Sequence, residues 1–362
     1  MTDIGLRKEE LDTPFLWVDL QALESNISTM AGDFKAAGVA WRPHTKGIKV
    51  PAIAHKAIRA GAIGVTCAKL GEAEVMAAAG ITDILIHNQI VTPQKIARLI
   101  GIYHHADVKV AVDSESNVLA LGSAAHAAGV EISVVVEVDN GGNRAGVEPG
   151  EPTVALARLA YQTPGVRFMG LAAYEGHARA IRPEEAKVEA IKRAVRMLTD
   201  SADMCRQAGI PVEIVSAGGS GTYHVTAYMP GVTEIQAGGA LFCDLVYQSW
   251  GVNTMPALFV RTTVTSRPRP ERINFDCGFK SLPTWIGAPK PMGLPAFKSL
   301  VMSAEHGTAT LEEPDRSILV GDAFDFMVGY ADATVFLYDV IYGIRAGIVE
   351  TVWPILGRGK VR

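Results

Sequence analysis

Short β-branched runs alternate with longer, Ala-rich amphipathic stretches over much of the chain, from about Leu20 to Gly239. This alternation is typical of repeated βα units around a parallel sheet. The strand-like runs are Val39–Arg42, Ile63–Thr66, Ile84–His87, Lys109–Val112, Ile132–Val138, Phe168–Ala172, Ile214–Ser216 and Glu234–Gln236. The helical patterns between them include Pro51–Gly61, Gly71–Gly80, Pro93–His104 and Glu184–Gly209. Strands and helices in this order predict a closed (β/α)8 barrel over residues 20–241.

The pattern changes after about Phe242, where strand-like runs are separated by Pro- and Gly-rich turns. These runs are Leu258–Thr265, Arg272–Asp276, Asp325–Met327, Thr334–Tyr338 and Val349–Trp353. They predict a separate, mainly β domain. The run Thr13–Asp19 is also strand-like, and we expect it to pair into that domain. The predicted fold class is therefore α/β, with a barrel at 20–241 and a β domain formed by 1–19 and 242–362.

Composition narrows the range of partners and of cellular locations. The chain has 362 residues and a net charge of −4, so it lacks the excess of Lys and Arg that nucleic acid or anionic membrane binding needs. The N-terminus has no apolar core of a signal peptide, and no later stretch is apolar enough to span a membrane. We therefore expect a cytoplasmic protein that acts on a small molecule.

Four cysteines are scattered along the chain, at Cys67, Cys205, Cys243 and Cys277. None of them forms a C-x-x-C pair, so neither a disulfide framework nor a thiolate zinc site is indicated. We expect reduced and mostly buried thiols.

In a (β/α)8 barrel, the carboxyl ends of the strands and the loops after them form the active site. This rule selects the segments His44–Lys46, Asp139–Arg144, Tyr174–His177, Ser216–Thr222 and Ala237–Gly239. Lys46 follows the first predicted strand, where a partly deprotonated amine can form a Schiff base. The alternative is a solvated loop lysine, which is the commoner fate of the residue type.

Two glycine-rich segments follow the last two predicted strands. The first supplies Ser216, Gly219, Ser220, Gly221 and Thr222, and the second supplies Gly238 and Gly239. Backbone N–H groups and hydroxyls of this kind can hold a phosphate group. A glycine cluster alone usually marks a plain turn, but two of them on adjacent strands favour a phosphate site.

Three further side chains at these strand ends can take part in chemistry. Arg144 can orient a ring or a carboxylate by forked hydrogen bonds, or it can simply tie its loop together. Tyr174 supplies an aromatic ring, and His177 is a candidate general base near neutral pH. The alternative for His177 is a solvated loop histidine. In the β domain, the polar segments are Ser303–Gly307, which holds His306, and Gly329–Thr334, which holds Tyr330 and Asp332.

Taken together, these segments resemble the D-threonine aldolase and D-serine dehydratase family, fold-type III pyridoxal phosphate enzymes that share the alanine racemase barrel. The resemblance runs through Thr13-Pro14, Arg42–Lys46, Glu137–Val147, Ala173–Gly176, Ser216–Tyr223, Glu234–Gly238, Asp276–Lys280, Glu305–Gly307 and Val352–Pro354. Within the family, the chain is most similar to the D-threonine aldolases and the 3-hydroxy-D-aspartate aldolases, which end in a similar Trp-Pro and Arg-Gly-Lys tail.

The resemblance implies that Lys46 holds pyridoxal 5'-phosphate as a Schiff base. It also implies that Ser216–Thr222 and Gly238-Gly239 bind the phosphate, that Arg144 lies near the cofactor ring and that Tyr174 lines the cofactor. A homodimer is expected, with each site completed by the β domain of the partner. The segment Gly47-Ile48-Lys49 departs from the family, which more often has a second histidine next to the lysine.

A second departure concerns a metal ion. Members of the family bind a divalent ion through a histidine and, two residues later, an aspartate or cysteine, and the matching residues here are Tyr330 and Asp332. Asp332 keeps the acidic ligand. A protonated tyrosine is a poor ligand for the hard ions Mg²⁺ and Mn²⁺, which argues against a divalent cation as second cofactor.

The expected activity is retro-aldol cleavage of a small β-hydroxy-D-amino acid, of the D-threonine or 3-hydroxy-D-aspartate type, to glycine and an aldehyde. His177 or His306 is the candidate base, helped by Tyr330. A dehydratase, which typically needs a Lewis acid, and a racemase or epimerase that uses Tyr330 as its second acid/base are alternatives. A non-catalytic pyridoxal phosphate carrier is another, although such proteins typically lack a β domain. His87, Arg179 and Arg182 are candidates for binding a second substrate carboxylate, but exposed arginines are common.

Overall fold

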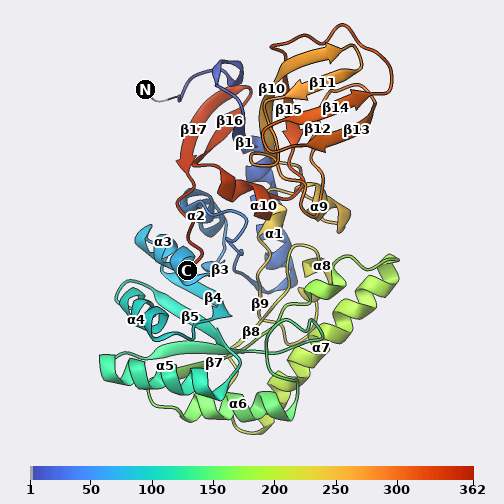
Figure 1. Cartoon of the computed structure of the whole chain (residues 1–362). Coiled ribbons are helices and arrows are strands. Elements are labelled where there is room, and N and C mark those ends of the chain that lie inside the picture. Colours follow the sequence, from blue (N-terminus) through green and yellow to red (C-terminus); the bar gives the residue numbers. More distant parts are fainter. Residues whose placement is uncertain (1–2) are drawn as a thin grey trace. The chain divides into compact units, whose positions relative to one another are not determined.

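A computed structural model describes residues 3–362, which divide into two compact units (Figure 1). The first unit comprises the described part of Met1–Thr29, Gly47–Ala52 and Gly239–Gly359. The second comprises Met30–Lys46, Ile53–Gly238 and Lys360–Arg362. We call the first the β unit and the second the barrel unit.

The barrel unit is built on eight parallel strands. They are β2 (Ala40–Trp41), β3 (Val65–Cys67), β4 (Asp83–Gln89), β5 (Asp107–Val112), β6 (Ile132–Glu137), β7 (Val166–Ala172), β8 (Ile214–Ala217) and β9 (Glu234–Ile235). Their order is β2-β9-β8-β7-β6-β5-β4-β3. A parallel bridge between His44 and Thr66 links the segment after β2 to β3 and closes the ring. The predicted barrel and all eight of its strands are confirmed.

Helices follow the strands and lie outside them (Figure 1). They are α1 (Leu20–Ala37), α2 (Pro51–Arg59), α3 (Leu70–Ala78), α4 (Pro93–Ile102), α5 (Glu115–Ala128), α6 (Glu151–Gln162), α7 (Glu184–Gln207) and the short α8 (Tyr223–Thr226). The start of α4 shows why the sequence places a helix there. Thr92 caps it by accepting from Lys95 N at 3.4 Å, and Pro93, which has no N–H to satisfy, occupies its first turn.

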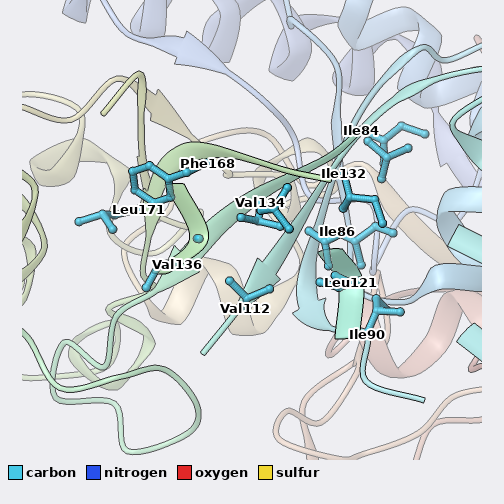
Figure 2. Packing of buried hydrophobic residues seen from close by; sticks show 14 of the residues in the cluster. Ile84, Ile86, Ile90, Val112, Leu121, Ile132, Val134, Val136, Phe168 and Leu171 are labelled. Atoms are coloured by element: carbon cyan, nitrogen blue, oxygen red, sulfur yellow. The ribbon is translucent and has the colours of Figure 1, made fainter. Parts of the chain in front are cut away.

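The side chains of the barrel strands alternate between two apolar layers. Ile84, Ile86, Val134 and Val136 belong to the large cluster that the strands share with the helices (Figure 2). The residues between them, Leu85 and Val135, belong to a second, smaller cluster with Ala111, Met169 and Ala172. Two residues beyond Val135, Glu137 keeps this second orientation at the carboxyl end of β6. His87 lies where the register of β4 shifts, and its ring contacts Gln236. The alternation therefore directs the polar side chain of Glu137 into the mouth of the barrel.

The β unit contains a nine-stranded sheet. Its strands are β1 (Phe15–Asp19), β10 (Leu258–Arg269), β11 (Arg272–Phe275), β12 (Lys290–Pro291), β13 (Phe297–Met302), β14 (Gly307–Leu311), β15 (Ala323–Met327), β16 (Val340–Arg345) and β17 (Ile348–Pro354). The N-terminal β1 pairs antiparallel with β10 and parallel with β16. The prediction that Thr13–Asp19 joins the β domain is confirmed.

The strand predicted over Thr334–Tyr338 is wrong. The structure has a helical turn, α10 (Ala331–Thr334), followed by a 3-10 turn at Val335–Leu337. The Thr334 hydroxyl donates to the carbonyl of Tyr330 at 2.9 Å, and the N–H of Ala333 donates to the same carbonyl at 3.1 Å. These local hydrogen bonds outweigh the β propensity of Thr334 and Val335.

Two expectations from composition can be compared with the structure directly. All four cysteines are buried and free of disulfide bonds. Across residues 3–362, none of the helices combines the length and the apolar character that a membrane span requires.

Candidate active site

The segment that carries Lys46 lies against the last strand of the barrel. β2 pairs with β9, and beyond this pairing the N–H of His44 donates to the carbonyl of Gln236 at 3.0 Å. A Cβ on Gly238 would overlap the backbone of His44, so only glycine allows the two segments to come this close. Lys46 is half-buried, and its N–H donates to Nδ1 of His44 at 3.3 Å.

The glycine-rich loop after β8 is held by a buried carboxylate. Glu175, fully buried, accepts from the N–H of Gly218 at 3.3 Å and from the hydroxyl of Thr226 at 2.5 Å. Within the loop, the N–H of Gly219 donates to the hydroxyl of Thr222 at 3.0 Å. Ser216, Ser220 and Thr222 are themselves buried. Glu175 therefore fixes the shape of the loop from the neighbouring strand end.

Tyr174 connects this loop to Arg144. A Cβ on either Gly176 or Gly219 would overlap its ring, so both glycines permit close packing against it. On another side, the guanidinium carbon of Arg144 lies 5.7 Å from the ring centroid, within the range of a cation–π contact. The structure thus brings together three positions that the sequence analysis selected.

A buried carboxylate that the sequence analysis did not select holds Arg144. Glu137 Oε1 lies 3.1 Å from Nη2 of Arg144 and 3.6 Å from Nε2 of His87, and its Oε2 accepts from Gln89 Nε2 at 2.6 Å. Burial alone would raise the pKa of Glu137, but His87 and Arg144 outweigh it and lower the pKa to about 2. Glu137 is therefore a fixed negative charge at the barrel mouth.

His177 lies exposed beside the loop of Arg144. Its Nε2 would be 3.6 Å from a Cβ on Gly141, and its Nδ1 would be 3.7 Å from one on Gly142. Asp139 shapes this loop, because its Oδ1 accepts from the N–H groups of Gly141 and Asn143, both at 3.0 Å. The imidazole is thus free to reach solvent at the rim of the barrel.

The three candidates for a second carboxylate occupy different environments. His87 is half-buried, with its ring inside the barrel. Arg179 donates from Nη1 to the carbonyl of Gly176, and Arg182 lies 3.7 Å from Glu184. Of the three, His87 is the one whose ring contacts a residue across the barrel, because its Nδ1 lies 2.9 Å from Oε1 of Gln236.

In the β unit, Tyr330 and Asp332 form a hydrogen-bonded pair. The phenol of Tyr330 donates to Asp332 Oδ2 at 3.1 Å. Asp332 also borders Gly47, the residue directly after Lys46, because a Cβ on Gly47 would overlap Oδ1 of Asp332. Gly47, which departs from the family pattern, therefore leaves room for the carboxylate of Asp332.

An aromatic cluster surrounds Tyr330 and extends to the second glycine segment. The ring centroids of Tyr247, Trp250 and Trp285 lie 6.0, 6.2 and 5.9 Å from that of Tyr330. A Cβ on Gly239 would overlap the ring of Tyr247. Within the β unit, the residue that follows Lys46 and the glycine that ends the second glycine segment thus border one polar and aromatic cluster.

Asp244 accepts hydrogen bonds from backbone N–H groups at two places in this cluster. It accepts from the N–H of Tyr247 at 2.9 Å, as the N-cap of α9 (Leu245–Ser249), and from the N–H of Ala331 at 2.6 Å. Burial, reinforced by the nearby charge of Asp332, raises the pKa of Asp244 to about 7. His306 lies elsewhere in this unit, with an exposed side chain on the turn between β13 and β14.

The Tyr330 and Asp332 pair does not fit a hard divalent cation. Mg²⁺ and Mn²⁺ bind through several oxygen ligands, usually carboxylates and carbonyls. Here one member of the pair is a phenol that donates its hydrogen to Oδ2 of Asp332, so it offers a metal no charged oxygen. Among residues 3–362, no group of three or more His, Cys, Asp and Glu side chains is arranged to hold a metal ion.

The barrel mouth does fit a bound cofactor. Nε2 of His87 and Nδ2 of Asn140 are buried at the carboxyl ends of β4 and β6, and within the described chain neither has a hydrogen-bond partner. Buried polar atoms without partners are rare in folded proteins and are expected where a ligand binds. The amine of Lys46 and two glycine-rich segments belong to the same end of the barrel.

Comparison with known proteins places these features in a family. Residues 18–245 match the alanine racemase N-terminal domain, and residues 257–344 match the serine dehydratase domain. The chain is 36% identical to a D-threonine aldolase from an Arthrobacter species, over 97% of this chain and 94% of that protein. It is 34% identical to a 3-hydroxy-D-aspartate aldolase from Paracoccus denitrificans, over 98% and 94% of the two chains.

A solved structure agrees with these sequence relatives. The crystal structure of a D-threonine aldolase from Filomicrobium marinum matches with a TM-score of 0.95 and 35% identity, and the match covers 100% of this chain and 99% of that one. The chain therefore belongs to the D-threonine aldolase, 3-hydroxy-D-aspartate aldolase and D-serine dehydratase family, which is built on the alanine racemase barrel.

Proposed function

We propose that this protein is a pyridoxal phosphate lyase that cleaves a small β-hydroxy-D-amino acid, of the D-threonine or 3-hydroxy-D-aspartate type, to glycine and an aldehyde. The observation that carries the proposal is the setting of Lys46, whose strand end packs against Gly238 in a chain related over nearly its full length to two such aldolases. When bound, the cofactor supplies an electron sink beside the substrate Cα.

The barrel unit supplies the groups that bind the cofactor in this proposal. The amine of Lys46 holds the cofactor aldehyde, and the Ser216–Thr222 loop with Gly238 and Gly239 holds the phosphate. The ring of Tyr174 forms a wall, and Arg144, anchored by Glu137, presents its guanidinium to the ring or to the substrate carboxylate. The rigid support of the loop by Glu175 favours these roles.

The pair Tyr330 and Asp332 supplies the proton acceptor in the place of the metal pair. Cleavage of the Cα–Cβ bond requires that the β-hydroxyl lose its proton as the aldehyde forms. Because the phenol already donates to Asp332, its proton can pass to the carboxylate while the phenol oxygen takes the β-hydroxyl proton. His177 and His306 are the alternative bases, and the exposure of both imidazoles favours Tyr330 over either of them.

Dimerisation and location follow from the same proposal. We infer a homodimer, because the β unit exposes large apolar side chains that a monomer rarely leaves in water. These are Phe279, Trp285, Val301, Leu319 and Val320. The four buried thiols without disulfides support a reducing, cytoplasmic location. Light scattering at several protein concentrations tests the dimer.

A product assay tests the proposed reaction. Cofactor-loaded protein is incubated with D-threonine and with both diastereomers of D-3-hydroxyaspartate, in EDTA and with added Mn²⁺. We expect glycine and an aldehyde, and we expect their formation to persist in EDTA. Ammonia with a keto acid would assign a dehydratase, to which residues 257–344 are similar, and an inverted amino acid alone would assign a racemase.

A further inference from the structure

A directed chain of hydrogen bonds crosses the interior of the barrel. It begins at Arg42, whose Nε lies 3.1 Å from each carboxylate oxygen of Glu234, with both side chains buried. This contact makes Glu234 an acceptor, so the hydroxyl of Ser216 donates to it at 2.7 Å. Gln236 Nε2 then donates to the Ser216 oxygen at 2.9 Å. The amide oxygen of Gln236 is left as an acceptor.

The chain ends at His87, on the opposite part of the ring. Nδ1 of His87 lies 2.9 Å from Oε1 of Gln236, although β4 and β9 are not neighbours in the sheet. Because that amide oxygen can only accept, Nδ1 must carry the hydrogen. The tautomer of His87 is therefore set by Ser216 and Glu234, on β8 and β9, and by Arg42 and Gln236, which directly follow β2 and β9. The Nε2 edge of the ring is left to face Glu137.

Nε2 of His87 faces the carboxylate that anchors Arg144. It lies 3.6 Å from Oε1 of Glu137, too far for a hydrogen bond, and it has no other partner in the described chain. The same Oε1 atom is 3.1 Å from Nη2 of Arg144. An imidazole edge and a guanidinium thus converge on one carboxylate oxygen, while Gln89 holds the other.

We propose that His87 is a positioning residue that acts through Glu137 on Arg144. When Nε2 carries a hydrogen as well, this edge of the ring, presented by the Arg42-to-Gln236 chain, attracts the carboxylate against which Arg144 is aligned beside Tyr174. The inference rests on the proposed function only in the role of Arg144 toward cofactor or substrate.

A matched pair of substitutions separates the two edges of the ring. An asparagine amide nitrogen lies near the place of Nδ1, and a glutamine amide nitrogen lies near the place of Nε2, since the side chains differ by one methylene. His87→Gln, which keeps a donor near the place of Nε2, should therefore lower kcat/KM less than His87→Asn does. His87→Asn should lower kcat/KM by about 10- to 100-fold, the usual effect of removing a group that orients a functional side chain. Equal losses in the two variants, with unchanged thermal midpoints, would overturn the proposal.

A double-mutant cycle tests whether the effect passes through Arg144. Arg144→Lys keeps the charge and loses the forked geometry. If His87 acts by aligning the guanidinium, this substitution should cost much less in the His87→Asn background than in the wild type. The visible spectrum of the bound cofactor should change in the same pattern as kcat/KM. Equal costs in both backgrounds would show that His87 does not act through Arg144.

The tautomer can be read without any assay of activity. In protein labelled with ¹⁵N-histidine, the His87 resonances, assigned by their loss in His87→Gln, should show a hydrogen on Nδ1. Gln236→Leu should abolish that preference. A hydrogen on Nε2 alone would overturn the inference even if the enzyme is an aldolase. Absence of aldolase products with the Nδ1 tautomer present would instead count against the proposed function alone.

Discussion

The two units hold their central carboxylates in opposite ways. In the barrel unit, Glu137 is paired with Arg144 and His87, and its pKa falls to about 2. In the β unit, Asp244 is buried near Asp332 with only backbone N–H groups as donors, and its pKa rises to about 7. The barrel unit thus holds Glu137 as a fixed negative charge, whereas the β unit holds Asp244 with a pKa of about 7.

The largest effect is expected from the loss of the lysine that we propose binds the cofactor in the barrel unit. Lys46→Ala removes the amine that we propose holds the cofactor, so kcat should fall by at least about a thousandfold, as when a covalent catalytic group is removed. The visible absorbance of the bound cofactor should disappear as well. Lys49→Ala, which removes the next lysine along the chain, is the matched control and should retain both. Loss of the cofactor absorbance in Lys49→Ala, with the absorbance retained in Lys46→Ala, would show that the cofactor is attached to Lys49.

The next effect tests proton exchange in the β unit. Tyr330→Phe removes the phenol but keeps the ring packing, so kcat should fall by about a hundredfold, the usual contribution of a positioned acid or base. The kcat of the His177→Gln and His306→Gln enzymes should fall much less. A Tyr330→Phe enzyme as active as the wild type, together with an inactive His177→Gln or His306→Gln enzyme, would transfer the role of base to that histidine.

Replacement of Tyr330 by histidine tests whether the Tyr330 and Asp332 pair takes the place of a metal site. Tyr330→His places an imidazole two residues before Asp332, and an imidazole with a carboxylate is a better donor pair for Mn²⁺ than a phenol with a carboxylate. Activity of this variant should rise with added Mn²⁺ and fall in EDTA, while that of the wild type should respond to neither. A wild type that EDTA inactivates would show that the Tyr330 and Asp332 pair does not replace a metal.

Opposite pKa shifts predict opposite dependences of stability on pH. The folded-state pKa of Glu137 lies below its ordinary value of 4.5, so its stabilising effect is present above pH 4.5 and is lost as the pH falls toward 2. Asp244 is shifted upward from 3.8, so its contribution is present below pH 3.8 and is lost as the pH rises toward 7. Each pKa unit corresponds to about 1.4 kcal/mol.

Urea unfolding of two variants measures these contributions. Glu137→Gln should lose about 1–3 kcal/mol of unfolding free energy at pH 7, because charged hydrogen bonds to Arg144 and Gln89 are lost. Glu131→Gln, at the exposed residue directly before the same strand, is the control. Asp244→Asn should flatten the pH dependence between pH 4 and 7. A curve for Asp244→Asn that parallels the wild type would show that Asp244 is ionised throughout.

The fold was predictable because it follows from the pattern of apolar and polar residues along the sequence. Alternation along each strand, and of strands with helices, set the barrel, and the placement of Lys46, Arg144 and Tyr174 followed from the rule for strand ends. Thr334–Tyr338 was mispredicted because local hydrogen bonds to the carbonyl of Tyr330 overrode β propensity.

The network inside the barrel could not be predicted in the same way. His87 meets Gln236 across the ring, 149 residues away in sequence, and no local pattern encodes such a pairing. Glu137 ends the most hydrophobic strand, and only the inward alternation from Val135 marks it as a residue of the barrel mouth. Asp244 precedes a helix of five residues and looks like an ordinary N-cap until its burial is known.

Chemical trapping shows whether Lys46 is the lysine that holds the cofactor. Protein loaded with pyridoxal phosphate is reduced with borohydride, digested and analysed by peptide mass spectrometry. We expect a single phosphopyridoxyl label, on the peptide that contains Lys46. A label on another lysine, or no label on protein that has bound the cofactor, would contradict the assignment of this barrel mouth as the active site.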